Sequence, residues 1–133
     1  MSGILLALFG GGGATQSTNY VVNVGQFLYG GASYLNGFYS TYGSVTPTVF
    51  SNTSSTILEL AWSYNDRTGS TNMIFTVNGN QLQSAFTNLA VSGQVFTSAS
   101  ATFYGSSGQS QWTWNAPTNP FPTVGANVTV YFS

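Results

Sequence analysis

The sequence predicts an all-β domain, a sandwich or a jelly-roll-like barrel with about eight to ten short antiparallel strands. Three observations lead to this prediction. Apolar and polar residues alternate at the period of two that half-buried strands require. Turn residues such as Gly, Asn, Ser and Pro recur about every 8–12 positions. No segment carries the 3.6-residue period of a long amphipathic helix.

The composition indicates a folded domain whose surface consists of hydroxyls and amides. Only 2% of the 133 residues are charged, against about 25% in an ordinary domain. Aromatic residues make up 16%, and such a charge-poor, aromatic-rich chain is the opposite of a disordered one. A net charge of −1 gives almost no repulsion between copies. This favours a protein that ends in an assembly or lies outside the cell.

The N-terminal segment differs from the rest of the chain. Its apolar residues are Ile4, Leu5, Leu6, Leu8 and Phe9, and four glycines follow at 10–13. We expect residues 1–13 to form an arm on a glycine hinge that docks on a neighbouring subunit, and residues 14–133 to form a single β-sandwich domain. A first strand of the domain and a cleaved signal peptide are the alternatives, although a signal peptide has a basic start that this run lacks.

The first strands are predicted between Asn19 and Tyr42, which reads as strand, turn and strand. At its start, Tyr20, Val22 and Val24 alternate with Val21 and Asn23 at the period of two. Thr46–Phe50 follows as an edge strand, because Pro47 has no N–H to give to a central ladder.

The clearest strand pair is a hairpin over Ile57–Val77. Its arms are Ile57–Tyr64 and Asn72–Val77, with turn residues between them. The residues that share one face of the first arm are Leu58, Leu60, Trp62 and Tyr64. Glu59 lies on the other face, so we expect it to be hydrogen-bonded or at an interface, since a lone buried carboxylate is costly.

In the second half we expect a loop with one helical turn at Gln81–Asn88, a long strand at Gln94–Tyr104, and strands at Gln109–Asn115 and Ala126–Ser133. Between the last two, Ala116–Pro122 holds three of the four prolines and is expected to cross without pairing. The small residues that alternate in the long strand indicate close approach of a second sheet or a neighbouring subunit.

The residue types exclude most catalytic sites. The chain has no His, Cys or Lys, so neither a Ser–His–Asp nor a Cys–His system can form, and the preferred ligands of transition metals are missing. The two acids, Glu59 and Asp66, are at least about 20 Å apart along an extended strand, too far for a glycosidase pair. We therefore expect a protein that is not an enzyme and has neither cofactor nor metal.

Two classes of partner are also excluded by composition. One Arg cannot neutralise a row of phosphates, so we expect no nucleic acid partner. No apolar run approaches the roughly 18 residues of a membrane-spanning helix, so we expect no membrane partner.

Binding and assembly remain. Aromatic side chains among amides and hydroxyls are typical of glycan sites, and the candidates for glycan or protein contact are Tyr39, Tyr42, Trp112 and Trp114. As neighbours on one face of a strand, however, such tryptophans are more often part of core or inter-sheet packing. A secreted, fibre-forming protein is a third hypothesis, because uncharged β-segments suit cross-strand polymerisation.

The whole chain resembles the small, charge-poor, Gly/Ser/Thr/Asn-rich β proteins of tailed-bacteriophage virions. The apolar start Met1–Phe9, its hinge Gly10–Gly13, the short strands and the near absence of charge carry this resemblance. It implies a structural protein of the virion, either a capsid decoration (cement) protein or a tail or fibre component. The partners implied are copies of itself and other virion proteins, bound through the arm, with a host-surface glycan as the alternative.

Overall fold

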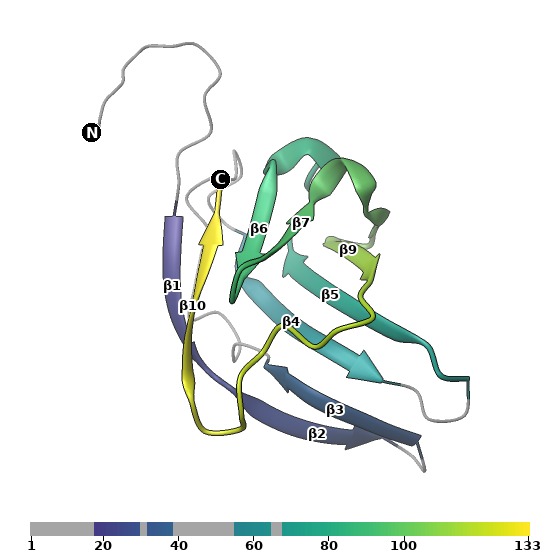
Figure 1. The fold of residues 1–133 in the computed structure, drawn as a ribbon. Coiled ribbons are helices and arrows are strands. Elements are labelled where there is room, and N and C mark those ends of the chain that lie inside the picture. The colour runs from purple at the N-terminus through teal and green to yellow at the C-terminus, as the bar shows by residue number, and fades with distance from the viewer. Residues whose placement is uncertain (1–17, 30–31, 39–54, 65–67) are drawn as a thin grey trace.

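Two antiparallel β-sheets form a sandwich in the computed structural model, which describes residues 18–29, 32–38, 55–64 and 68–133 (Figure 1). The elements within these ranges are β1 (Thr18–Asn23), β2 (Gly25–Tyr29), β3 (Ala32–Phe38), β4 (Ile57–Tyr64), β5 (Thr71–Asn78), the 3₁₀ turn η1 (Gln83–Ala85), β6 (Asn88–Val91), β7 (Gln94–Thr97), the 3₁₀ turn η2 (Ser98–Ser100), β8 (Thr102–Ser106), β9 (Gln109–Asn115) and β10 (Asn127–Phe132). The predicted all-β sandwich is confirmed.

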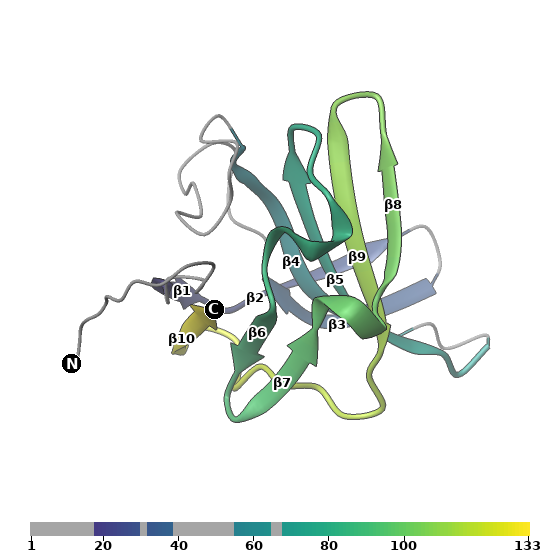
Figure 2. The same cartoon turned by 90° about the horizontal axis from the view of Figure 1, so that it is seen from above.

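The chain passes repeatedly from one sheet to the other. Sheet A has the order β1-β10-β6-β7, and sheet B has the order β2-β3-β4-β5-β9-β8. The chain therefore changes sheets between β1 and β2, β5 and β6, β7 and β8, and β9 and β10. Figure 2 shows the hairpin of β8 and β9 reaching beyond β6 and β7.

The core between the sheets is apolar and rich in aromatic rings. Its largest fully buried side chains are Trp112, Phe75, Phe86, Phe132, Leu60, Met73 and Leu89. Phe86, in the segment between η1 and β6, has its ring centroid 5.0 Å from that of Trp112 in sheet B and 5.7 Å from that of Phe132 in sheet A. This ring therefore joins the two sheets, and edge and tilted aromatic pairs of this kind add to the burial of their area.

Each of the three tryptophans holds a segment that crosses between the sheets. The bonds run from the Trp112 indole N–H to the Gln83 carbonyl (2.9 Å), from Trp114 to Thr97 (2.8 Å), and from Trp62 to Ala116 (2.8 Å). The Gln83 and Ala116 carbonyls belong to the β5–β6 and β9–β10 connections, and Thr97 is the last residue of β7, where the chain leaves sheet A for β8. Because a buried indole N–H needs an acceptor, burial of each tryptophan fixes the path of one crossing.

The single strand predicted at Gln94–Tyr104 is wrong. The chain leaves sheet A at the end of β7, makes the turn η2, and enters sheet B as β8. The Ala101 N–H donates to the Ser98 carbonyl at 3.2 Å, and the Thr97 and Ser100 hydroxyls lie 2.7 Å apart. Short Ser, Ala and Thr side chains fit a turn as readily as a strand, so their alternation did not locate this break.

Two smaller differences have local causes. The predicted helical turn in Gln81–Asn88 is present as η1. The strand β6, which begins at Asn88, was not predicted, because its residues do not show a clear alternation of apolar and polar side chains with those before it. Leu58 was expected to share a face with Leu60 and Trp62, which are buried, but it is only half-buried itself. A β-bulge between Ile57 and Glu59 shifts the register, so that Ile57 is buried instead, with 4% of its surface exposed.

Other expectations agree with the structure. Val22 and Val24 are buried while Val21 and Asn23 are exposed, as the period of two predicts. The strand predicted at Gln109–Asn115 is β9, with the same bounds. The edge strand expected at 46–50 and the arm expected at 1–13 lie outside the described residues, so both stay predictions.

Candidate functional site

The outer face of sheet B carries a row of polar side chains that its register aligns. The row takes one residue from each of β4, β5, β9 and β8, namely Glu59, Thr76, Gln111 and Tyr104. We call these four residues the outer row. The alignment follows from the antiparallel ladder, in which directly opposed residues point to the same face.

Hydrogen bonds join three members of the outer row. The Gln111 amide donates to the Thr76 hydroxyl at 3.1 Å, and that hydroxyl donates to a Glu59 carboxylate oxygen at 3.3 Å. Thr76 is only 6% exposed although it lies on the outer face. Of the two alternatives expected for Glu59, a hydrogen bond or an interface, the structure shows the hydrogen bond.

Burial sets the electrostatics of the outer row. Desolvation raises the pKa of Glu59 above its ordinary value of 4.5, and the hydrogen bond from Thr76 lowers it by a smaller amount. The single Arg of the sequence, Arg67, lies outside the described residues. Burial thus makes the charged form of this carboxyl more costly than it is in water, and the hydrogen bond from Thr76 offsets part of that cost.

The second feature is one of the two edges of sheet B, formed by Thr102–Ser106, which we call the β8 edge. β8 is the last strand of the sheet order and pairs only with β9 among the strands described. Its residues are exposed except Phe103, which is partly buried and packs against the core, its ring centroid 5.1 Å from that of Trp112. Tyr104, in the middle of the strand, is 66% exposed.

The turn after β8 fixes which backbone groups face this edge. Ser107 and Gly108 have φ of 55° and 79°, as a two-residue hairpin turn requires, and Ser106 stands opposite Gln109. The residues that flank such a turn exchange both hydrogen bonds, and this pairing repeats at every second residue of the ladder. The N–H and C=O groups of Tyr104 therefore face β9, while those of Phe103 and Gly105 face the open edge.

Trp112 and Trp114 are not a surface platform for glycans. Trp112 is 0% exposed and Trp114 is 6% exposed. Their indole N–H groups are bonded to backbone carbonyls, as described above. Sheet A covers the face of β9 that carries them, so the core explanation of this pair holds and the binding explanation is wrong.

The other predicted contact residues, Tyr39 and Tyr42, lie outside the described residues. So do the residues of the proposed arm, Ile4, Leu5, Leu6, Leu8 and Phe9. Thr76, Gln111 and Tyr104 did not emerge from the sequence, because they are brought together by the pairing of strands distant in the chain. Alternation within β9 places Gln111 on the other face of the strand from the two tryptophans. Only the register shows which residues of β5 and β8 lie beside it.

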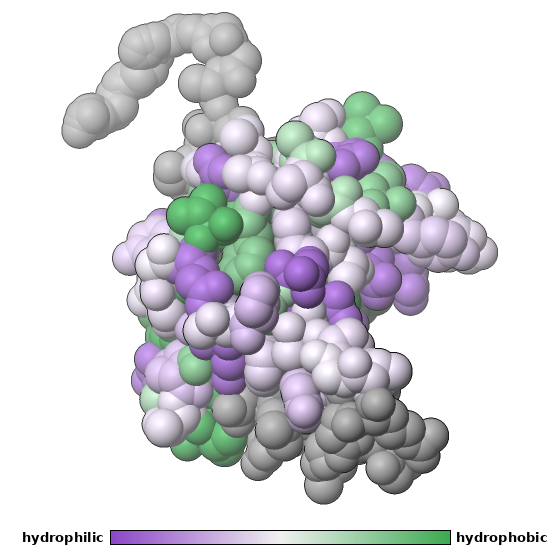
Figure 3. All heavy atoms as spheres, turned by 45° about the vertical axis from the view of Figure 1, so that its right-hand side comes forward, coloured by the Kyte–Doolittle hydropathy of each residue, from purple (hydrophilic) through white to green (hydrophobic). Residues whose placement is uncertain are grey.

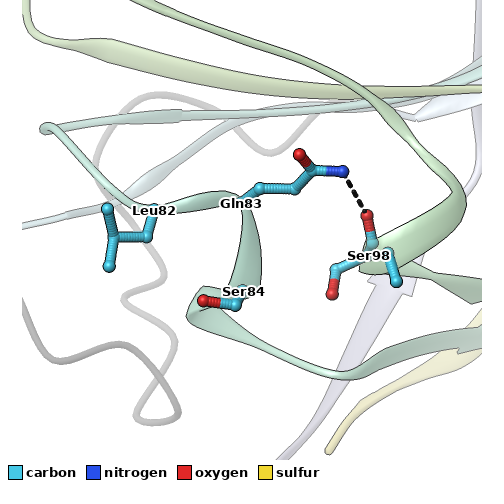
Figure 4. Close-up of a pocket in the computed structure, with 5 residues that line it drawn as sticks. Leu82, Gln83, Ser84 and Ser98 are labelled. Atoms are coloured by element: carbon cyan, nitrogen blue, oxygen red, sulfur yellow. Dashed lines mark hydrogen bonds between the residues drawn. The ribbon is translucent and has the colours of Figure 1, made fainter.

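A hollow of about 480 Å³ lies between the two 3₁₀ turns and is lined by Leu82, Gln83, Ser84, Ser98 and Ala99 (Figure 4). The Gln83 amide donates to the Ser98 carbonyl at 3.0 Å and to the Ala101 carbonyl at 3.2 Å. The Ser98 hydroxyl donates to the Phe86 carbonyl at 2.5 Å. These polar groups join η1 to η2, so the hollow is better explained as a structural junction than as a binding site.

The described part of the surface offers little else for chemistry. Figure 3 shows one face on which pale and purple residues predominate and green apolar residues stand in small groups. Among the residues that the structure describes, no three His, Cys, Asp or Glu side chains are grouped as a metal site, and no helix is long and apolar enough to span a bilayer. No family model, curated protein or solved structure matches the chain.

Proposed function

We propose that this protein is a non-enzymatic structural component of a virion that assembles with copies of itself, as a capsid decoration or a tail accessory. The observation that supports this best is the β8 edge. Soluble proteins protect open sheet edges with charged residues, proline or bulges, because an open edge pairs with other chains. Thr102–Ser106 contains no charged residue and no proline, and its pairing with β9 shows no register shift.

The composition supports the same proposal. With a net charge of −1 and three charged residues in all, copies of the chain approach one another without electrostatic repulsion. A surface of hydroxyls and amides forms hydrogen bonds to a neighbour and remains soluble until it does so. The arm expected at residues 1–13 adds a second contact to neighbouring subunits, which strengthens an assembly that each contact alone holds weakly.

The experiment is the solution mass of the full-length protein and of a version that begins at Ala14, measured by light scattering after size exclusion. We expect the full-length protein to form a defined oligomer and the truncated version to lose mass while keeping its β-type circular dichroism spectrum. Two folded monomers at all concentrations tested would contradict the proposal.

Glycan binding is the second candidate, and Tyr104 is the observation that favours it. With Trp112 and Trp114 buried, Tyr104 is an exposed aromatic ring that stands opposite the Gln111 amide. A glycan array probed with the full-length protein and with Tyr104→Ala tests this candidate. Binding that Tyr104→Ala removes and Val95→Ala preserves would support it, since Val95 is similarly exposed, at 59%, on the other sheet.

A further inference from the structure

We propose that two copies of the chain pair through their β8 edges, antiparallel and about a two-fold axis at Tyr104, to form one continuous sheet. This inference rests on the proposed self-assembly and names the surface and register that carry it. The occupant of the edge is a second copy because the edge is complementary to itself in its backbone groups, its side chains and its charge.

The backbone groups match first. The N–H and C=O of Phe103 and of Gly105 face the open edge, as the hairpin turn requires. In an antiparallel pair centred on Tyr104, Phe103 of one copy lies opposite Gly105 of the other. These two residues then exchange both hydrogen bonds, and the two-fold axis repeats the exchange. All four free groups of each edge are satisfied in this register.

The side chains on the inner face match as well. Gly105 has no side chain, and the Phe103 ring already lies over it, since a Cβ added at Gly105 would be 3.5 Å from that ring. In the pair, each phenylalanine stands opposite a glycine and diagonal to the other phenylalanine. Diagonal neighbours are within reach of aromatic side chains, so the two rings extend the aromatic core from one copy into the other.

The outer face has no charge that opposes the pairing. Tyr104 stands opposite its own copy, so the outer rows of both copies become one line that runs across eight strands, four from each copy. The other outward residues of β8 are Thr102 and Ser106. In the pair, Thr102 of one copy stands opposite Ser106 of the other, and both side chains carry a hydroxyl group. Like charges opposed across a ladder are destabilising, and none occurs here.

The edge is short, so the pairing is weak by itself and is best detected by trapping. The chain has no cysteine, which gives a clean background for single-cysteine variants. Residues opposed without mutual hydrogen bonds have Cα atoms about 4.5 Å apart, within the range that a disulfide spans. Tyr104→Cys in the full-length chain should therefore form a disulfide dimer under mild oxidation about tenfold or more faster than Val95→Cys, because paired edges hold the two thiols together.

A second pair of variants tests the register. Thr102→Cys alone should dimerise as slowly as Val95→Cys, because its partner in the pair is Ser106 of the other copy. A mixture of Thr102→Cys and Ser106→Cys chains should give the mixed disulfide rapidly. Fast homodimers of Thr102→Cys would mean another register and would overturn the proposal.

A charge variant tests the pairing without a cross-link. Tyr104→Lys places two ammonium groups opposite each other and should remove the association, while Val95→Lys should not. Both side chains are largely exposed, so neither change is expected to unfold the domain, which circular dichroism checks. Unchanged association of Tyr104→Lys would overturn the proposal.

The remaining outcomes separate the edge from the assembly as a whole. A mixed disulfide between Leu6→Cys and Tyr104→Cys chains that outpaces the Tyr104→Cys homodimer would show that the arm fills the edge, and would overturn the two-fold pair. A defined oligomer by light scattering with no preference for cross-linking at Tyr104 would also overturn it, yet would leave the proposed self-assembly standing. Monomers in both experiments would remove the proposed function as well.

Discussion

Two rows of residues cross the same four strands of sheet B, one residue apart, and they differ in almost every property. The inner row consists of Leu60, Phe75, Trp112 and Phe103, which the register of β4, β5, β9 and β8 aligns. The outer row is the polar line on the opposite face. Since successive residues of a strand point to opposite faces, one backbone ladder carries both rows.

The inner row gains its stability from burial and from ring contacts. The Trp112 ring lies 5.4 Å from that of Phe75 and 5.1 Å from that of Phe103, measured between centroids. Burial of such large rings is the main favourable contribution to folding. The inner row ends at Phe103, on the β8 edge, so the aromatic core reaches the open side of the sheet.

The outer row gains its order from the hydrogen bonds that join Glu59, Thr76 and Gln111, and it buries little apolar surface. It begins at half-buried Glu59 and ends at exposed Tyr104. Its members are held in place but remain polar, so this face can meet another molecule without loss of the fold. The same strand register therefore aligns a row that stabilises the fold on one face and a row that is available for contact on the other. Both rows end at the β8 edge.

The largest expected effect comes from the inner row. Trp112→Ala removes a fully buried ring together with the bond from its indole N–H to the Gln83 carbonyl. We expect the free energy of unfolding to fall by about 3–5 kcal/mol, which chemical denaturation measures. Tyr104 follows Phe103, the residue of β8 that stands opposite Trp112. Tyr104→Ala should change the free energy of unfolding by less than about 0.5 kcal/mol, because this side chain is exposed. Equal losses would show that the two rows do not differ as described.

An intermediate effect is expected at the centre of the outer row. Thr76→Val keeps the shape of a buried side chain but removes the hydroxyl that joins Gln111 to Glu59. The loss of these bonds should cost about 1 kcal/mol of unfolding free energy. The matched control is Thr113→Val, the same change on the outer face of β9 but outside the row. A control that costs as much as Thr76→Val would mean that the hydrogen bonds are not the cause.

The inner row was largely predictable from the sequence, because alternation reports burial. Leu60 and Trp62 fall on one face of β4, and Trp112 and Trp114 fall on one face of β9, and all four are buried. The strand bounds of β9 follow from the turn residues before it and the proline-rich segment after it. What alternation could not decide is whether a paired tryptophan face meets a second sheet or solvent, since both need the same spacing.

The outer row and the crossings were not predictable in the same way. Glu59 and Thr76 are 17 residues apart and Thr76 and Gln111 are 35 apart, so their contact depends on which strands pair. The break between β7 and β8 depends on tertiary bonds, such as the one from the Trp114 indole to the Thr97 carbonyl. The β-bulge that buries Ile57 likewise follows from the pairing with Val77 and not from the alternation in β4.

The smallest expected effect separates charge from shape at the start of the outer row. Glu59→Gln keeps an oxygen that accepts the bond from Thr76 and removes the charge that burial penalises. Because the folded-state pKa of Glu59 is raised above 4.5, the native wild type binds more protons than the unfolded chain just above that pH. Its stability therefore falls as the pH rises through this window and the carboxyl ionises.

Glu59→Gln has no such group, so it should be more stable than the wild type at neutral pH and equally stable below about pH 4, where the wild-type carboxyl is protonated. Unfolding free energies of both proteins, measured by denaturation from acid to neutral pH, give a difference curve. Asp66 is common to both proteins and cancels from it. A wild type that is more stable than Glu59→Gln at neutral pH, and that loses this advantage as the pH falls, would contradict the prediction. It would mean that the carboxylate is stabilised in the row, so that the outer row is held by charge as well as by hydrogen bonds.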